Sequence, residues 1–288
     1  MKRQGLRIRA AVIIILASLL FASLRGMPYV QLLFSFKYIL YSLAGIVAIT
    51  LLAAKRVTKP VRLVFLLIFF YIFGVAIGIH PSPLCALTKA PLRYHLSGFI
   101  PPPMMVMAAV MLLLTIVGNK IFCGWICPLG CLQEAAFLLS KGISKIKCSF
   151  FTTNAVRALL LLLFIILLIS QDINIYDFFN PFEIFHWHFT LPLIVIISLV
   201  LAASLLLYRP FCQFVCPAGL LTWIFERTSL FAVRKNENRC TNCRQCIKAG
   251  PCSAIEAILN SRQIVPDCFA CGACITSCPE DALTFSLK

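Results

Sequence analysis

Long apolar runs, separated by short basic segments, make up most of the first 230 residues. A helix needs about 20 predominantly apolar residues, with a range near 17–25, to cross a bilayer. Six runs meet this length once a few flanking residues are included: 8–24, 38–54, 63–79, 104–117, 155–169 and 191–207. The pattern predicts an α-helical integral membrane protein with about six transmembrane helices.

The connecting segments alternate in charge. Lys and Arg gather before the first predicted span, between the second and third, and between the fourth and fifth. The last alternate loop instead carries Asp172, Asp177 and Glu183. Because Lys and Arg are retained on the cytoplasmic side, we expect both termini in the cytoplasm of a bacterial inner membrane. The net charge of +16 then reflects membrane topology and contact with lipid, and nucleic acid is not an expected partner.

Composition divides the chain near residue 230. Hydrophobic residues make up 61% of the sequence and charged residues 12%, whereas about 25% of a soluble domain is charged. Eight of the fifteen cysteines lie between Cys240 and Cys278. We therefore expect a transmembrane domain over 1–230 and a small domain over 231–288. In the reducing cytoplasm these thiols suit metal ligation better than structural disulfides.

The stretch "CFACGACITSCP" begins at Cys268 and has the spacing C-x2-C-x2-C-x3-C-P. This is the bacterial ferredoxin spacing, in which three thiolates bind one iron–sulfur cube and the fourth binds the other. The preceding "CTNCRQC" repeats it with Cys240, Cys243 and Cys246, but the next cysteine, Cys252, comes two residues late. A bulge through Ala249–Gly250 would correct this, and glycine suits a bulge.

Two [4Fe–4S] clusters are predicted on this basis. Cys240, Cys243, Cys246 and Cys278 would hold the first, and Cys268, Cys271, Cys274 and Cys252 the second. The alternative is that Cys252 misses its place and leaves a three-iron cluster. Because "CSAIEAI" and "CPEDALTF" look like the same turn-and-strand unit, we expect an α+β, two-cluster ferredoxin-like domain that carries electrons.

A second repeat lies in the membrane part. "KIFCGWICPLGCL" aligns with "RPFCQFVCPAGLL" at an offset of 89 residues, so that both cysteines, Pro and Gly coincide. The prolines suit the first turn of a new helix. We expect a pseudo-two-fold arrangement that gathers Cys123, Cys127, Cys212 and Cys216 at the cytoplasmic membrane surface. Three interpretations stay open: a further metal or iron–sulfur centre, redox-active dithiols, or free thiols in a structural motif.

With these motifs the chain resembles the NapH and NosR group of membrane-bound polyferredoxins. The resemblance covers about residue 60 to the end, without the external flavin-binding domain of NosR-like members. It implies electron transfer that involves quinol, as in a quinol dehydrogenase, and a partner redox protein.

Two regions are candidates for contact with a quinone. His80, His95, His186 and His188, with Glu183, lie in predicted external loops, where they would form either a proton-accepting site or an ordinary interfacial loop anchored by Trp187. Trp125 and Phe214 lie near the predicted cytoplasmic thiols, where they would be either close to a quinone or ordinary packing residues. An external quinol site would require a relay across about 30 Å of hydrocarbon, so the cytoplasmic region is the easier one to connect.

The function expected from the sequence is electron transfer between the quinone pool, or a cytoplasmic donor, and a partner redox protein. A different class is an accessory or maturation factor for a partner metalloenzyme, without quinol turnover. A redox sensor is a third. Quinol-dependent reduction of the clusters would distinguish the first from the others.

Overall fold

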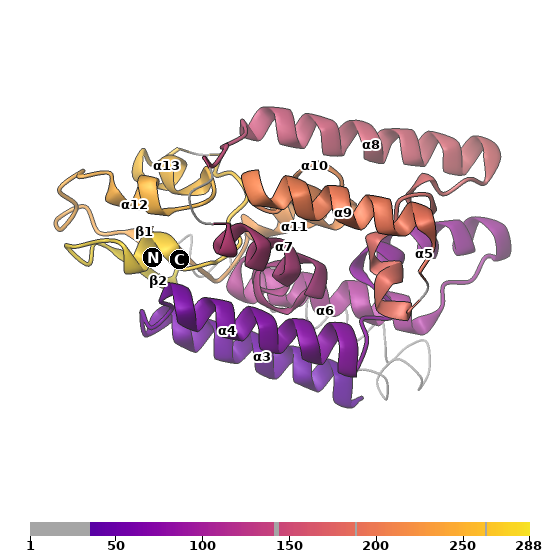
Figure 1. The fold of residues 1–288 in the computed structure, drawn as a ribbon, viewed down its shortest axis with the longest axis horizontal. Helices are drawn as coiled ribbons and strands as arrows, with labels where there is room; N and C mark the ends of the chain where they lie inside the picture. The colour runs from indigo at the N-terminus through magenta and orange to yellow at the C-terminus, as the bar shows by residue number, and fades with distance from the viewer. Residues whose placement is uncertain (1–34, 141–143, 188, 263) are drawn as a thin grey trace.

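The computed structural model describes residues 35–140, 144–187, 189–262 and 264–288. It is mostly helical, with one small sheet (Figure 1). In the first 230 residues the helices are α3 (Phe36–Ala53), α4 (Lys59–Phe70), η1 (Tyr71–Ala76), α5 (Pro83–Ser97), α6 (Pro102–Gly118), η2 (Phe122–Ile126), α7 (Pro128–Leu139), α8 (Phe150–Gln171), η3 (Ile175–Asp177), η4 (Pro181–His186), α9 (Leu191–Leu206), α10 (Pro210–Phe214) and α11 (Pro217–Glu226). The C-terminal part contains β1 (Phe231–Lys235), α12 (Gln245–Ala249), α13 (Ala254–Leu259), α14 (Ala273–Thr276) and β2 (Leu283–Leu287).

Three helices among the described residues are long and apolar enough to cross a membrane: α3, the continuous α4–η1 helix (Lys59–Ala76), and α8. They coincide with the second, third and fifth predicted spans. The fourth and sixth correspond to α6 and α9, which are apolar but have only 17 and 16 residues. The predicted span over 8–24 lies outside the described residues. A six-span topology therefore stays a prediction.

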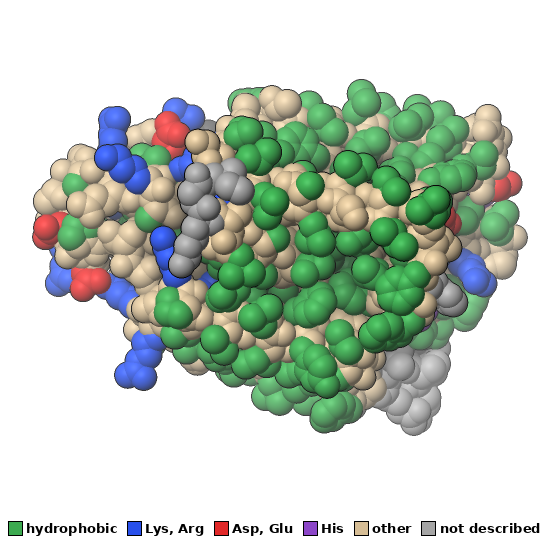
Figure 2. All heavy atoms as spheres, viewed as in Figure 1, with side chains coloured by type: hydrophobic (Ala, Val, Ile, Leu, Met, Phe, Trp, Pro, Cys, Tyr) green, Lys and Arg blue, Asp and Glu red, His purple; other side chains and the backbone are tan. Residues whose placement is uncertain are grey.

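Apolar side chains are spread over the face of the helical body that Figure 2 shows. Leu159 and Ile169 on α8 and Leu191 and Leu199 on α9 are each more than 60% exposed. Burying large apolar side chains from water is favourable by about 1.5–3 kcal/mol each, so a surface of this kind is suited to lipid. Charged side chains appear mainly around the C-terminal domain, at one end of the long axis.

The two repeats of the membrane part have the same path. After α6 and after α9 the chain turns back into the helical body through η2 or α10, and it leaves again through α7 or α11. Contacts with α3 show how far the chain moves along the body between the end of α6 and η2. A side chain at Gly118 would contact Ile49 of α3, whereas the ring centroid of Phe122 lies 5.6 Å from that of Tyr41. Those α3 residues are eight positions apart, or about 12 Å. Pro128 and Pro217 each begin the outgoing helix, as expected for proline at the first helical position.

The C-terminal domain is built around an antiparallel pair, β1 and β2, in which Val233 is opposite Phe285. The predicted strand within "CSAIEAI" is wrong, because Ala254–Leu259 is the helix α13. Strand β2 pairs with Phe231–Lys235 instead. The Ala, Glu and Leu residues of Ala254–Leu259 are good helix formers.

The domain is fixed against the basic loops of the helical body. Lys55, between α3 and α4, forms an ion pair with Asp281 at 2.7 Å. Lys147, before α8, donates to the carbonyl oxygen of Ile247 at 2.6 Å. The basic loops and the C-terminal domain therefore lie at the same end of the molecule, as the charge pattern predicted. We call the opposite end, formed by α5, η3 and η4, the distal end.

Candidate iron–sulfur centres

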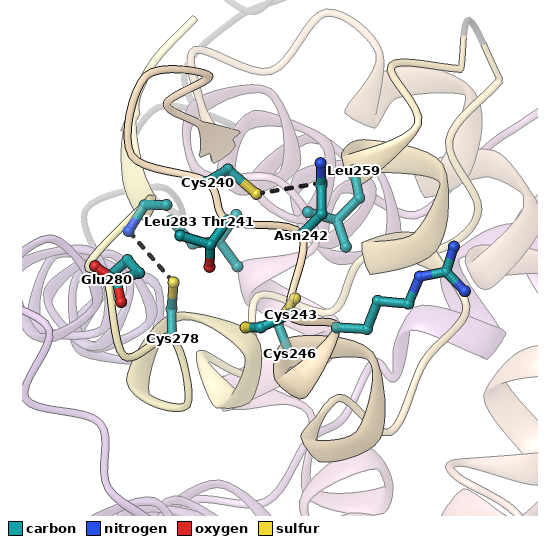
Figure 3. A pocket seen from close by; sticks show the side chains of 11 residues that line it. Cys240, Thr241, Asn242, Cys243, Cys246, Leu259, Cys278, Glu280 and Leu283 are labelled. Carbon is teal, nitrogen blue, oxygen red and sulfur yellow. Dashed lines mark hydrogen bonds between the residues drawn. The ribbon is translucent and has the colours of Figure 1, made fainter.

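Four cysteines of the C-terminal domain line one small pocket, which is partly open to solvent. They are Cys240, Cys243, Cys246 and Cys278, the set predicted for the first cluster. Figure 3 shows their sulfur atoms around the same opening. The backbone N–H of Ala282 donates to the sulfur of Cys278 at 3.3 Å. We call this group the outer set.

The second predicted set also comes together. The thiols of Cys268, Cys271 and Cys274 lie within electrostatic range of one another and of Cys252. Burial raises the pKa of Cys252 to about 12, against a smaller opposing effect from the N–H groups of Ala254 and Ile255. A thiol in this setting stays protonated unless a metal binds it. We call this group the inner set.

The position of Cys252 depends on Gly250, but not through an unusual backbone angle. Gly250 has φ −72°, so it is not in the left-handed region. A Cβ there would lie 2.9 Å from the carbonyl oxygen of Cys246 and 3.2 Å from Ile255. Glycine is required for close packing at the end of α12, and the chain then extends to Cys252.

Both ferredoxin loops share a backbone signature around their middle cysteine. Asn242 and Arg244 flank Cys243 with φ of 55° and 58°, and Ala270 and Gly272 flank Cys271 with φ of 49° and 79°. For residues other than glycine this conformation costs about 1–2 kcal/mol. The same costly geometry at equivalent positions indicates that both loops are shaped to enclose a group.

A third group consists of Cys123, Cys127, Cys212 and Cys216, which we call the quartet. Each is at most 9% exposed. The thiol of Cys212 lies within electrostatic range of the other three. Cys123 lies in η2 and Cys212 in α10, while Cys127 and Cys216 are the N-cap residues of α7 and α11.

The quartet is gathered as predicted and lies inside the helical body, and its predicted place at the cytoplasmic membrane surface stays a prediction. Tyr41, near the distal end of α3, and Tyr176, in η3, lie within electrostatic range of Cys127 and Cys216 respectively. A side chain at Gly74 would contact both Pro128 and Phe185 of η4. The thiols lie inside the helical body because η2 and α10 turn back into it.

The pseudo-two-fold relation extends to the groups around the quartet. A Cβ at Gly130 would lie 2.6 Å from Nη1 of Arg209 and 2.7 Å from the carbonyl oxygen of Cys123. At the equivalent Gly219 it would lie 2.8 Å from Nη1 of Arg157 and 2.5 Å from the carbonyl oxygen of Cys212. Because both positions are glycine, an arginine guanidinium can lie against the backbone of each Cys-x-x-x-Cys-Pro motif.

The donor chemistry of all three groups fits iron–sulfur cubes, which are held by four thiolates. Among the residues that the structure describes, no three His, Cys, Asp or Glu side chains are spaced to hold a single metal ion. Sulfur atoms on one zinc ion lie about 2.3 Å from it and hence close together, whereas a cube distributes its four thiolates over four irons. Cys131, a further buried thiol, instead donates to the carbonyl oxygen of Trp125 at 3.1 Å.

Glu134 is the centre of a buried ion network beside the quartet. Its carboxylate accepts from Arg62 at 2.8 Å, from Arg209 at 2.5 Å and from the hydroxyl of Tyr208 at 2.7 Å. Both arginines also donate to the carbonyl oxygen of Gly124. The network fixes the backbone that carries Cys123.

The second repeat has a related network that reaches the inner set. Asp267, which precedes Cys268, accepts from Lys120 and, at 2.6 Å, from Arg157. Lys120 also donates to the carbonyl oxygen of Gly219 at 2.8 Å, and Arg157 to that of Cys212 at 3.2 Å. Lys120 and Arg209 occupy equivalent positions of the repeat. Buried cations of this kind are suited to a negatively charged thiolate-bound cluster.

Phe269 inserts the inner-set loop into the helical body. It is 1% exposed, and Lys120, Arg209 and the ring of Tyr208 lie 5.4, 5.1 and 5.8 Å from its ring centroid. A Cβ at Gly124 would overlap the Phe269 carbonyl oxygen. The indole nitrogen of Trp125 donates to the carbonyl oxygen of Ala270 at 3.0 Å. The inner set and the quartet thus share a direct backbone contact.

Trp125 is fully buried and Arg62 lies 4.0 Å from its ring centroid. The structure supports the packing alternative for Trp125, because the indole is enclosed by protein. Phe214 is partly buried.

The predicted histidine region lies at the distal end. The rings of His80 and His186 are 4.8 Å apart, and His95 lies 3.3 Å from Asp172. Lys89 pairs with Asp177 and Glu183 at 3.4 and 3.7 Å. Burial, followed by the charges of His186, Lys37 and Lys89, lowers the pKa of His80. His188 lies outside the described residues.

Sequence reasoning missed the buried charges around the thiols. Arg62, Lys120 and Arg157 were counted with the basic connecting loops and Arg209 was given no role, yet each is at most 3% exposed. One signal was available, because Lys120 and Arg209 stand three residues before Cys123 and Cys212 in both repeats.

Comparison with known proteins is consistent with this arrangement. The family model of a 4Fe–4S binding domain matches residues 100–147 and 188–236, which contain the two Cys-x-x-x-Cys-Pro motifs. One model matching both segments confirms the internal repeat. No solved structure matches the chain.

Several relatives are ferredoxin-type proteins. The chain is 30% identical to the putative electron transport protein YccM of Escherichia coli over 68% of this chain and 60% of YccM. It is 23% identical to the ferredoxin-type protein NapH of E. coli, over 67% of this chain and 71% of that protein. It is 25% identical to the methylamine utilization ferredoxin-type protein MauN of Methylobacillus flagellatus, over 46% and 49%. The chain is thus similar to ferredoxin-type electron transport proteins that include NapH, and it spans 60% of the length of YccM.

Proposed function

We propose that this protein carries electrons through three iron–sulfur cubes, bound by the outer set, the inner set and the quartet, within the bacterial inner membrane. The observation that carries the proposal is the contact of Gly124 and Trp125 with the loop of Phe269 and Ala270. This contact joins the quartet to the inner set without intervening solvent.

The order of the centres follows from exposure and contact. Cys243 of the outer set is exposed, and the buried Cys246 lies within electrostatic range of Cys274 of the inner set. The inner set contacts the quartet through Phe269. Electrons can therefore pass from the membrane interior to the solvent-facing end, where a partner redox protein would exchange them, or in the reverse direction.

The donor on the membrane side is proposed to be a quinol. Its oxidation to quinone releases two electrons and two protons, so the electrons enter the clusters one at a time and the protons pass to water. The apolar surface of the helical body supports a lipid location for the protein. The cations around the quartet offset the negative charge of a reduced cube.

Low-temperature EPR with iron and sulfide quantitation tests the proposal on protein purified anaerobically in detergent. Three cubes correspond to about twelve irons. Replacing all four quartet cysteines with serine should remove about four irons and leave the other signals. A content of about eight irons in both proteins would restrict the metal to the C-terminal domain. Dithionite-reducible clusters that do not respond to quinol would refute quinol as the donor.

A further inference from the structure

A cavity of about 500 Å³ lies between the start of α8 and the C-terminal domain. Residues 147–151 line it on the side of the helical body. Residues of α12 and α13, with Arg262 and Ile264, line it on the other side. Its volume lies in the range of small-molecule sites, about 300–1,000 Å³, so the cavity is large enough for the polar head of a ligand.

Two cations line this cavity, Lys147 before α8 and Arg262 after α13. The ammonium of Lys147 uses one of its three N–H donors on the carbonyl oxygen of Ile247, at 2.6 Å. Glu256 is the acidic side chain in the lining. Among the residues that the structure describes, neither cation forms an ion pair with Glu256 or with any other carboxylate. Two positive charges and one negative charge leave the lining with a net charge of +1, which suits a ligand with one negative charge.

Two hydroxyl groups add neutral donors to the same lining. Ser149 and Ser253 precede α8 and α13, and neither side chain forms a cap hydrogen bond with the helix that follows it. A serine hydroxyl can donate to an anionic oxygen. The cavity therefore offers charged and neutral donors to one anion.

The cavity lies at one end of a predicted membrane span. Helix α8 has 22 residues and hence a length of about 33 Å, close to the roughly 30 Å of hydrocarbon in a bilayer. Phe150 and Phe151 of its first turn line the cavity. The ring centroid of Phe150 lies 5.2 Å from that of Trp223, and Trp is enriched at membrane–water interfaces. When α8 spans a bilayer, its first turn lies at the level of the lipid head groups.

Helix α8 also offers a surface for acyl chains that begins at this cavity. It lies at the edge of the helical body, with its first residues toward the C-terminal domain (Figure 1). Phe151, Leu159, Leu162 and Ile166 lie on one face at helical spacing, and each is more than 50% exposed. A lipid whose head group enters the cavity can place its acyl chains along this face, whereas a free phosphate cannot use it.

We propose that this cavity binds the head group of an anionic phospholipid from the leaflet on the side of the C-terminal domain. The phosphodiester accepts hydrogen bonds from Lys147 and Arg262, and the acyl chains follow the exposed face of α8. A head-group hydroxyl, as in phosphatidylglycerol, donates to Glu256. Basic pockets beside membrane helices bind anionic head groups in this way. A zwitterionic lipid such as phosphatidylcholine would bring its own cation toward the two basic residues and lose much of this attraction.

Native mass spectrometry of the holoprotein in detergent, titrated with dioctanoyl phosphatidylglycerol or phosphatidylcholine, tests the site. We expect phosphatidylglycerol to saturate one site and phosphatidylcholine to bind about tenfold more weakly. Lys147→Gln and Arg262→Gln should each raise Kd for phosphatidylglycerol about fivefold, the equivalent of about 1 kcal/mol per cation. The double variant should raise it about 25-fold, with unchanged iron content. If iron content falls in Lys147→Gln, because Lys147 also holds Ile247, Arg262→Gln alone decides.

The matched control is the double variant Arg56→Gln with Lys59→Gln. It removes the same two charges from exposed residues beside the loop between α3 and α4, which do not line the cavity. We expect it to leave Kd within about twofold of the wild type. Equal affinity for the two lipids, an equal rise of Kd in the control, or wild-type Kd in Arg262→Gln would each overturn the proposal. Inorganic phosphate that binds as tightly as phosphatidylglycerol would assign the cavity to a free anion and overturn the lipid site.

Discussion

Replacing Gly124 with alanine tests the contact that joins the quartet to the inner set. The new Cβ would lie under 3.0 Å from the carbonyl oxygen of Phe269, closer than real Cβ atoms approach other atoms. Because that oxygen belongs to backbone between Cys268 and Cys271, no flexible side chain can move to relieve the overlap. The loop that carries the inner set must shift.

The expected cost follows from three effects. Overpacking of a close contact costs about 1–3 kcal/mol. Loss of the Trp125–Ala270 hydrogen bond, which spans the same contact at 3.0 Å, adds about 0.5–1.5 kcal/mol. Alanine in a helical segment returns up to about 1 kcal/mol. The net loss is about 0.5–4.5 kcal/mol, which lowers Tm by roughly 1–18 °C at about 2–4 °C per kcal/mol.

The assay is thermal unfolding of holoprotein in detergent, followed by Trp fluorescence and by the visible absorbance of the clusters. Limited proteolysis between α11 and β1 would report whether the domain detaches. The matched control is Gln213→Ala, since Gln213 is the equivalent position of the second repeat and is partly exposed. We expect the control to change stability by less than about 0.5 kcal/mol. Wild-type Tm and proteolysis in Gly124→Ala would refute the reasoning.

Three other predictions follow from single sites. Glu134→Ala should cost about 3–5 kcal/mol, because Arg62 and Arg209 would stay buried without a carboxylate; a thermal unfolding curve close to that of the wild type would contradict it. Cys252→Ser should remove iron from the inner set and leave the outer-set EPR signal, and loss of neither signal would show that Cys252 is not a ligand. The lowered pKa of His80 means that the unfolded chain binds more protons just below about pH 6.5. Stability should therefore fall modestly between about pH 7.5 and 5.5, and His80→Gln should reduce this slope in Tm measured against pH.

Local spacing was enough to predict the ferredoxin part. The short loops of C-x2-C-x2-C determine which thiols can bind the same cluster. The spacing predicted the outer set and the inner set as two groups, and the structure gathers the same two groups. Even the displaced Cys252 was placed with the correct group, although Gly250 acts through close packing. The strand expected in "CSAIEAI" failed because strand pairing is a long-range choice, and β2 pairs with Phe231–Lys235.

The membrane part shows where sequence reasoning ended. Apolar periodicity located helices α3, α4–η1, α6, α8 and α9, and the 89-residue offset revealed the repeat. The depth of the quartet could not be predicted, because a turn at Asn119 or Tyr208 looks the same whether the next segment follows the surface or re-enters the body. Lys120 was counted with a connecting loop for the same reason, although it is buried.

The sequence by itself determined the membrane character, the repeat and the two ferredoxin ligand sets, since each depends on residues close together in the chain or on composition. Only the tertiary structure decided that the quartet lies inside the helical body and that Phe269 joins it to the inner set. These features depend on contacts between segments roughly 100 residues apart. The free energy of such contacts is set by the burial of polar and charged groups, which the spacing of residues along a chain does not specify.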